Sequence, residues 1–147
     1  AKIPCNVEVA SEYRYRHPLI LDETLFVTIS QSGETADTLE ALKIAKKINN
    51  KIYTLCICNS AESSITRESD LTFLTHAGPE IGVASTKAFT TQLVGLLMLT
   101  LILGRHHGLS SVAENAINNS LRALPDSLDA VMKLEDQIIK VAQKLDA

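Results

Sequence analysis

The most constraining feature of the sequence is the stretch from Thr24 to Thr38, in which an apolar run ends abruptly in small polar residues. Leu25 to Ile29 is rich in β-branched and aromatic residues and does not alternate with polar ones. This pattern is typical of a strand covered on both faces of a parallel sheet. After Thr35 the apolar residues recur at helical spacing, with lysines on the opposite side of the wheel. The stretch therefore predicts a buried strand, a polar loop and a helix.

The loop between these two elements has the composition of an anion site. The loop contains Ser30, Gln31, Ser32, Gly33, Glu34 and Thr35. The first turn of a helix presents about four backbone N–H groups without internal partners and carries partial positive charge. Hydroxyls add donors, and glycine lets the backbone approach a ligand. In the alternative interpretation the hydroxyl residues only cap the helix. The position at the carboxyl end of a buried strand, where open α/β sheets bind ligands, favours the anion site.

The rest of the chain continues the alternation of strands and helices. Further strands are predicted at 52–58 and 71–75, and a short one at 7–10, followed by a helical turn at 11–16 capped by Ser11. Together these segments predict a doubly wound α/β fold with a parallel sheet.

A long helix at 86–104 follows a second loop of small residues. This helix is apolar nearly all round, so we expect it to be buried between layers or at a subunit interface. Residues 110–147 predict two or three amphipathic helices with a break at Pro125. We expect residues 1–125 to form the domain and residues 126–147 a carboxyl-terminal helix, packed on the domain or leading to a following one.

Composition excludes several classes of function. The net charge is -3 and the pI about 5.8, so a nucleic-acid partner is not expected. The longest apolar run, 93–103, is short of the roughly 20 residues of a membrane span, so no membrane is expected either.

Three cysteines, an odd number, argue against a disulfide framework and indicate a reducing compartment, the cytoplasm. Cys56 and Cys58 have no further His or Cys nearby to complete a metal set, so we expect buried thiols, no metal and no cofactor.

Three segments, in the same order, resemble one known family. Pro4 to Arg16, Ser30 to Thr38 and Glu80 to Gln92 are similar to the first sugar-isomerase (SIS) domain of the glucosamine-6-phosphate synthases, the glutamine:fructose-6-phosphate aminotransferases. The resemblance covers essentially the whole chain and implies a three-layer αβα sandwich. It also implies that the loop described above holds a phosphate through Ser30, Gln31, Ser32 and Thr35, with Val83 and Ser85 near the sugar.

The resemblance implies that important parts of such an enzyme are outside this sequence. A glutaminase domain, a first strand with its Cys-Gly-Thr-Ser loop, and a second SIS domain with the catalytic residues would flank it, and Cys5 is not the glutaminase nucleophile. We expect no catalytic residue in this piece. Glu34 and Glu80 are interpreted as support for helix dipoles. Lys87 either approaches a phosphate or is solvated.

The expected function is binding of a hexose 6-phosphate, fructose 6-phosphate or glucosamine 6-phosphate, within an aminotransferase that makes glucosamine 6-phosphate for amino-sugar synthesis. A sugar-phosphate sensor attached to a transcriptional regulator is the alternative, because SIS domains also occur in regulators. A one-domain isomerase that works as an oligomer is a third hypothesis. The apolar helix at 86–104 and the carboxyl-terminal stripe offer surface for a homodimer.

Overall fold

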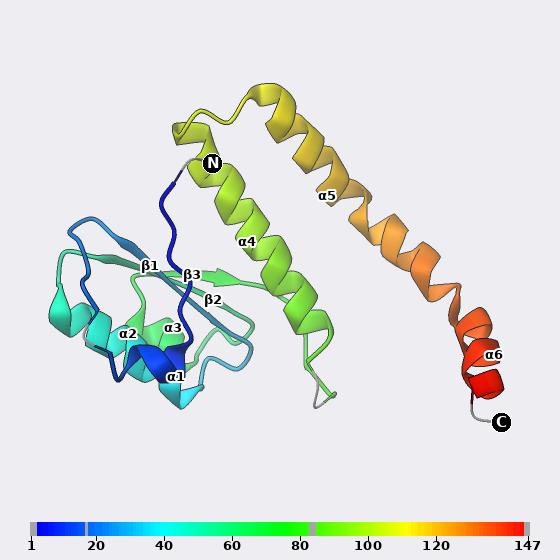
Figure 1. Cartoon of the computed structure of the whole chain (residues 1–147), viewed down its shortest axis with the longest axis horizontal. Coiled ribbons are helices and arrows are strands. Elements are labelled where there is room, and N and C mark those ends of the chain that lie inside the picture. Colours follow the sequence, from blue (N-terminus) through cyan, green and yellow to red (C-terminus); the bar gives the residue numbers. More distant parts are fainter. Residues whose placement is uncertain (1–2, 17, 83–84, 146–147) are drawn as a thin grey trace.

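The computed structural model describes residues 3–16, 18–82 and 85–145 of the 147-residue chain (Figure 1). The elements, in chain order, are α1 (Ala10–Tyr13), β1 (Leu25–Ser30), α2 (Ala36–Ile48), β2 (Tyr53–Cys58), α3 (Ser64–Glu68), β3 (Leu71–Leu74), α4 (Lys87–His106), α5 (Ser111–Met132) and α6 (Glu135–Leu145). The three longer strand predictions are confirmed to within one residue at either end.

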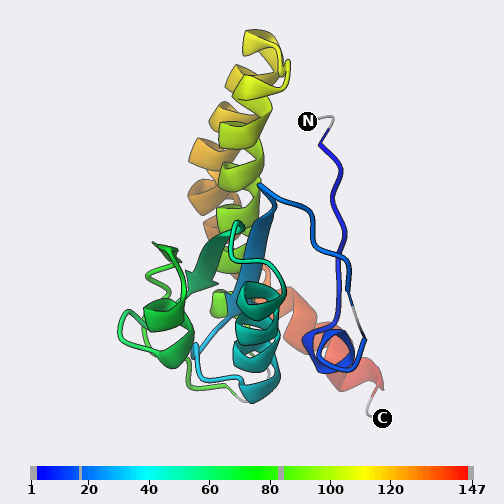
Figure 2. The ribbon, with the colours of Figure 1, turned by 90° about the vertical axis from the view of Figure 1, so that its left-hand side faces the viewer.

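The three strands form a parallel sheet in the order β1-β2-β3 (Figure 2). The register pairs Ser30 with Cys58 and Cys58 with Leu74, so the last residues of all three strands lie side by side. Because parallel strands share the direction of the chain, the loops that follow them leave from one edge of the sheet. This alignment brings the predicted anion loop next to the loops after β2 and β3.

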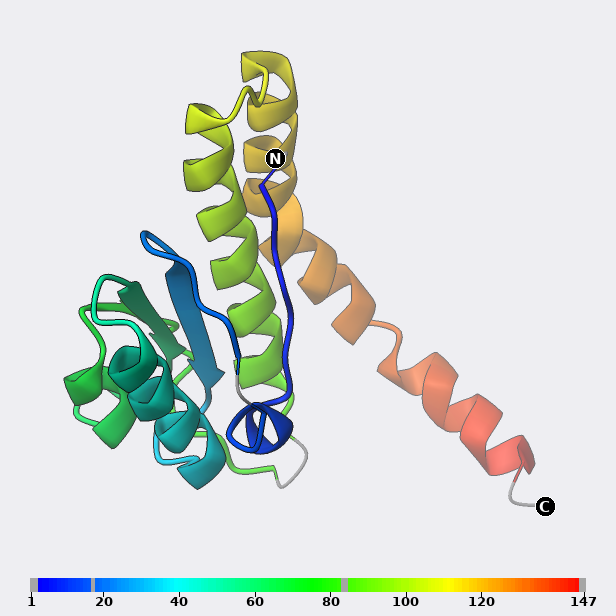
Figure 3. The same ribbon diagram turned by 60° about the vertical axis from the view of Figure 1, so that its left-hand side comes forward.

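Helices cover both faces of the sheet, which makes a three-layer α/β sandwich (Figure 3). On one face, Leu42 of α2 and Ile65 of α3 pack with Cys56 and Cys58 in a fully buried cluster. On the other face, α4 crosses the sheet at Gly95, where an added Cβ would lie 3.4 Å from the Cγ2 of Ile57. The alternation of side chains along β2 therefore separates the two layers.

The short strand predicted at 7–10 is wrong. Residues 3–9 carry no strand pairing, and the helical turn α1 begins at Ala10 with Val9, rather than Ser11, at its N-cap. A strand needs a hydrogen-bonded neighbour, and β1 is paired in the structure with β2 alone. Tyr13 instead anchors the segment, with its ring 5.5 Å from that of Phe26.

Helix α4 forms as predicted, but the expectation that it is buried is not met within this chain. Its buried residues are Ala88, Gly95, Leu101 and Gly104, whereas Phe89 is 58% and Ile102 54% exposed. By length and composition α4 could cross a membrane, since a window of it has a mean hydropathy of 1.5. The core helix of a soluble protein meets the same criterion, so the absence of a membrane partner stays a prediction.

The helix break predicted at Pro125 is also wrong. Helix α5 continues from Ser111 to Met132 through this proline, and α6 follows after a two-residue turn. Proline has no backbone N–H, so the carbonyl group four residues before it loses its helical hydrogen bond. None of the α5 residues is buried, so water can solvate this carbonyl group. Helix α5 runs beside α4, and α6 extends away from the sheet (Figures 1 and 3). The division into residues 1–125 and 126–147 remains a prediction.

Candidate functional site

The loop between β1 and α2 depends on a glycine. Gly33 has a φ of 69°, in the left-handed region that favours glycine, and it is buried. A Cβ at this position would overlap the side chain of Ser63 and lie 2.8 Å from the Sγ of Cys58. The loop can therefore follow its tight path against the start of α3 only with glycine at this residue.

The predicted hydroxyl residues converge within this loop. Ser30 is 5% exposed, and its Oγ accepts a hydrogen bond from the Gly33 amide at 3.0 Å. The same oxygen lies 3.0 Å from the Oγ1 of Thr35. Ser32 Oγ accepts from the amide of Glu34 at 3.2 Å. One hydroxyl proton is shared between Ser30 and Thr35, so two of the three hydroxyl protons remain available to a ligand.

The capping interpretation of Thr35 is not supported by the geometry. Thr35 is the N-cap residue of α2, but its side chain makes no capping hydrogen bond to the helix. The backbone amides in the first turn of α2 therefore keep their donor capacity and their partial positive charge. Asp37, the acidic residue of that turn, is paired with Arg14 at 2.7 Å, which offsets its negative charge beside the loop.

The loop is fastened to α3 by two backbone amides. Ser64 N donates to Glu34 Oε1 at 2.7 Å, and Ile65 N donates to the carbonyl oxygen of Gly33 at 3.0 Å. The hydrogen bonds from Ser64 lower the pKa of the Glu34 carboxyl group below its usual value. Glu34 thus supports a helix start, as predicted, although the helix is α3 rather than α2.

Asn59 connects the loops that follow the strands. Its backbone amide donates to Gln31 O at 3.2 Å, and its side-chain Nδ2 donates to Gly78 O at 2.8 Å. Its Oδ1 accepts from Ala77 N at 2.7 Å and from Thr75 Oγ1 at 3.2 Å. Asn59 was not among the residues predicted from the sequence, although a polar residue directly after a strand of a parallel sheet is a signal that could have indicated it.

The second loop, between β3 and α4, ends in another carboxylate contact. Glu80 Oε2 accepts from the amide of Ala88 at 3.0 Å and so supports the start of α4, as predicted. Ser85 is exposed at this loop, and Lys87 is an exposed residue in the first turn of α4. Val83, the other residue expected near the sugar, lies outside the described residues.

The Cys56 thiol and a hydrophobic groove take no part in this chemistry. Burial raises the pKa of the Cys56 thiol to about 11, which suits an unreactive core residue. Within the described ranges, no group of three or more His, Cys, Asp or Glu side chains is placed to hold a metal ion.

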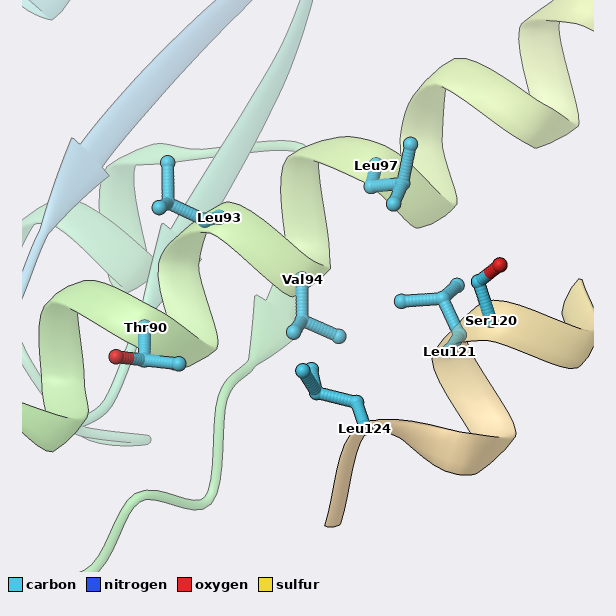
Figure 4. Close-up of a pocket in the computed structure, with 7 residues that line it drawn as sticks. All are labelled: Thr90, Leu93, Val94, Leu97, Ser120, Leu121 and Leu124. Carbon is cyan, nitrogen blue, oxygen red and sulfur yellow. The ribbon is translucent and has the colours of Figure 1, made fainter. Parts of the chain in front are cut away.

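A groove of about 340 Å³ lies between α4 and α5 (Figure 4). Its lining residues are Thr90, Leu93, Val94, Leu97, Ser120, Leu121 and Leu124. The lining carries no charge, and the Thr90 and Ser120 hydroxyls donate to carbonyl oxygens of their own helices, so the groove is poorly suited to a phosphate.

Comparison with known proteins shows to which protein family the chain belongs. The SIS domain family matches residues 1–102, and the chain belongs to this family. It is similar to the glutamine–fructose-6-phosphate aminotransferases (isomerizing) of Idiomarina loihiensis, at 56% identity over 143 residues, and of Pseudomonas syringae pv. tomato, at 58% over 144. Each alignment covers 97% of this chain and 23% of the relative, so the chain spans about a quarter of their length.

Solved structures agree with this assignment. The C-terminal domain of glucosamine-fructose-6-phosphate aminotransferase from Francisella tularensis matches with a TM-score of 0.89 and 46% identity, over 97% of this chain and 40% of that one. Glucosamine-6-phosphate deaminase from Thermotoga maritima matches less closely, with a TM-score of 0.57 and 26% identity over 71% of this chain and 31% of that one. The predicted family and the three-layer α/β fold are thus confirmed.

Proposed function

We propose that the chain binds the phosphate group of a hexose 6-phosphate at the loop between β1 and α2. The proposed phosphate ligands are Ser30, Gln31, Ser32, Gly33 and Thr35. The observation that carries the proposal is the uncapped start of α2 behind a left-handed glycine, with hydroxyl protons free to donate beside it. Ser85, together with Val83, is proposed to face the sugar.

The substrate class follows from membership of the SIS family together with the names of the relatives. Those relatives are named for fructose 6-phosphate, and the proposed ligands of this chain are therefore fructose 6-phosphate and glucosamine 6-phosphate. We propose that the chain is the sugar-phosphate-binding part of such an aminotransferase. The product of that enzyme would be glucosamine 6-phosphate.

This part is proposed to bind without turnover. The two carboxylates beside the loops, Glu34 and Glu80, are each held by a helix amide and are poorly placed to move a substrate proton. Lys87 is exposed at the start of α4, outside the kind of desolvated pocket that activates a lysine for covalent chemistry. An assay for interconversion of fructose 6-phosphate and glucose 6-phosphate should detect none. Turnover above the uncatalysed rate would contradict this part of the proposal.

Titration with nuclear magnetic resonance tests the binding site. Fructose 6-phosphate should shift the amide signals of residues 30–38, and fructose without phosphate should leave them unchanged. Ser32→Ala should weaken binding about tenfold, the loss expected for one hydrogen bond to a charged group. Ser127→Ala is the matched control, because that serine bonds only within α5, to Ala123 O at 3.1 Å. If neither sugar phosphate nor inorganic phosphate at millimolar concentration perturbs the loop, the proposal is wrong.

We also propose that a second copy of this chain covers exposed apolar side chains of α4 in a homodimer. The apolar side chains of Phe89, Leu93, Met98 and Ile102 on this helix are between 40% and 58% exposed. Phe89 and Leu93 lie on one side of the helix and Met98 and Ile102 on another, and exposed apolar surface of this extent is unusual on a monomer. The small net charge of -3 gives little repulsion between copies. Sedimentation should show a dimer that dissociates on dilution. A monomer at all concentrations would refute this pairing.

A further inference from the structure

The side chain of Asn59 holds the second loop by three hydrogen bonds. It donates to Gly78 O at 2.8 Å and accepts from Ala77 N at 2.7 Å and Thr75 Oγ1 at 3.2 Å. This loop turns sharply, because His76 has a φ of 51° and Gly78 a φ of 73°. A left-handed conformation is costly for a non-glycine residue, so the surrounding contacts must maintain it.

The backbone of the same residue contacts the first loop. Asn59 N donates to the carbonyl oxygen of Gln31 at 3.2 Å, in the middle of the proposed phosphate loop. Immediately before it, Cys58 O accepts from Thr75 N at 2.9 Å. One residue at the end of the central strand therefore connects the loops that follow both neighbouring strands.

The held part of the second loop lies close to the start of α4. A Cβ added at Gly78 would be 3.9 Å from the Nζ of Lys87. Glu80, further along the loop, supports the first turn of α4 through Ala88 N. The loop is thus fixed at its beginning by Asn59 and at its end by α4, and Ser85 lies between these two anchors.

We propose that Asn59 is a positioning residue that sets the spacing between the phosphate loop and the second loop. It thereby determines how much more tightly the site binds a hexose 6-phosphate than inorganic phosphate. This inference rests on the proposed function. The phosphate loop also has its own contacts with α3, through Glu34 and Gly33, which do not involve the side chain of Asn59. Loss of that side chain should therefore displace the second loop and leave the phosphate loop in place.

The experiment compares two ligands on the 147-residue chain. Isothermal titration calorimetry gives the affinities for fructose 6-phosphate and for inorganic phosphate in the unaltered chain and in Asn59→Ala. The ratio of the two affinities should fall about tenfold in the variant, while the affinity for inorganic phosphate changes less than about threefold. A residue with only a structural role would lower both affinities together and leave the ratio unchanged.

Asn49→Ala is a matched control from the opposite edge of the sheet. The Asn49 side chain also makes three hydrogen bonds, to Ile20 O at 3.1 Å, to Asp22 Oδ1 at 3.0 Å and from Lys51 N at 2.8 Å. Its loss should cost similar stability, yet the ratio of the two ligand affinities should stay unchanged. If Asn49→Ala lowers the ratio as much as Asn59→Ala does, the effect is one of general stability and the inference is wrong.

Asn59→Asp covers the case in which Asn59→Ala does not fold. The carboxylate keeps the acceptor for Ala77 N and loses the donor to Gly78 O. Its added charge acts on the phosphate group of both ligands, so it cancels in the ratio, which should again fall. An unchanged ratio in a folded variant, or failure of both variants to fold, overturns the inference. If the unaltered chain binds fructose 6-phosphate no more tightly than inorganic phosphate, the proposed phosphate site stands and the inference about Asn59 is wrong. If the chain binds neither ligand, the proposed function itself fails.

Discussion

Replacement of Gly33 by alanine should be among the most damaging single changes in this chain. The φ of 69° places an alanine in the left-handed region, at a cost of about 1–2 kcal/mol. The new Cβ would also overlap the side chain of Ser63 and lie 2.8 Å from Cys58 Sγ. Overpacking of this kind adds about 1–3 kcal/mol. The neighbours cannot move easily, because Ser63 caps α3 and Cys58 is fully buried.

The two costs together predict a loss of roughly 2–5 kcal/mol in the free energy of unfolding. For a domain of this size, that corresponds to a fall in Tm of roughly 4–20 °C. Urea denaturation followed by circular dichroism measures the free energy, and phosphate titration of the same sample measures the loss of binding. Both should decline, since the residue that strains the fold also shapes the proposed phosphate loop.

Substitutions at two other glycines separate the conformational cost of a positive φ from the cost of overpacking. Gly108 has a φ of 80° and no atom within 4 Å of an added Cβ, so Gly108→Ala carries only the conformational cost. Gly82 has no such neighbour and no positive φ, so Gly82→Ala should be close to neutral. If Gly33→Ala is no less stable than Gly108→Ala, the contact with Ser63 does not constrain the loop and the reasoning is refuted.

Three further predictions follow from other parts of the fold. Hydrogen bonds from Thr54 lower the pKa of Asp70, so its contribution to stability is present above its unfolded pKa of about 4 and is lost as the pH falls through the lower folded value. Asp70→Asn should therefore flatten the acid end of the curve of stability against pH, and an unaltered curve would contradict the assignment. Cys5 is exposed whereas Cys56 is buried with a raised pKa, so iodoacetamide at pH 8 should label Cys5 first by mass spectrometry, and equal labelling of the folded chain would contradict the buried setting. Gly95→Ala would place a Cβ 2.9 Å from an aromatic ring of β3 and should cost about 1–3 kcal/mol in thermal unfolding, so a Tm equal to that of the unaltered chain would contradict the close approach of α4.

The central motif was predictable because its determinants are local. An apolar strand, a glycine and small hydroxyl residues before an amphipathic helix lie within fifteen consecutive positions, 24–38. The propensities and periodicities of those residues act over the same short range. The failed predictions, in contrast, concern segments whose state depends on neighbours. Residues 7–10 form a strand only beside a partner strand, and α4 is buried only under a covering surface. Pro125 ends the helix only if water cannot reach the carbonyl group that proline leaves without an amide partner.

The sequence by itself determined the strand, loop and helix at 24–38 and the hydroxyls offered to an anion. Only the tertiary structure decided why the loop requires Gly33 and how the loop is held. Glu34 binds an amide 30 residues away, and the Asn59 side chain binds atoms 16, 18 and 19 residues further on. Such contacts depend on the register that ends β1, β2 and β3 side by side, and no periodicity in the sequence encodes that register.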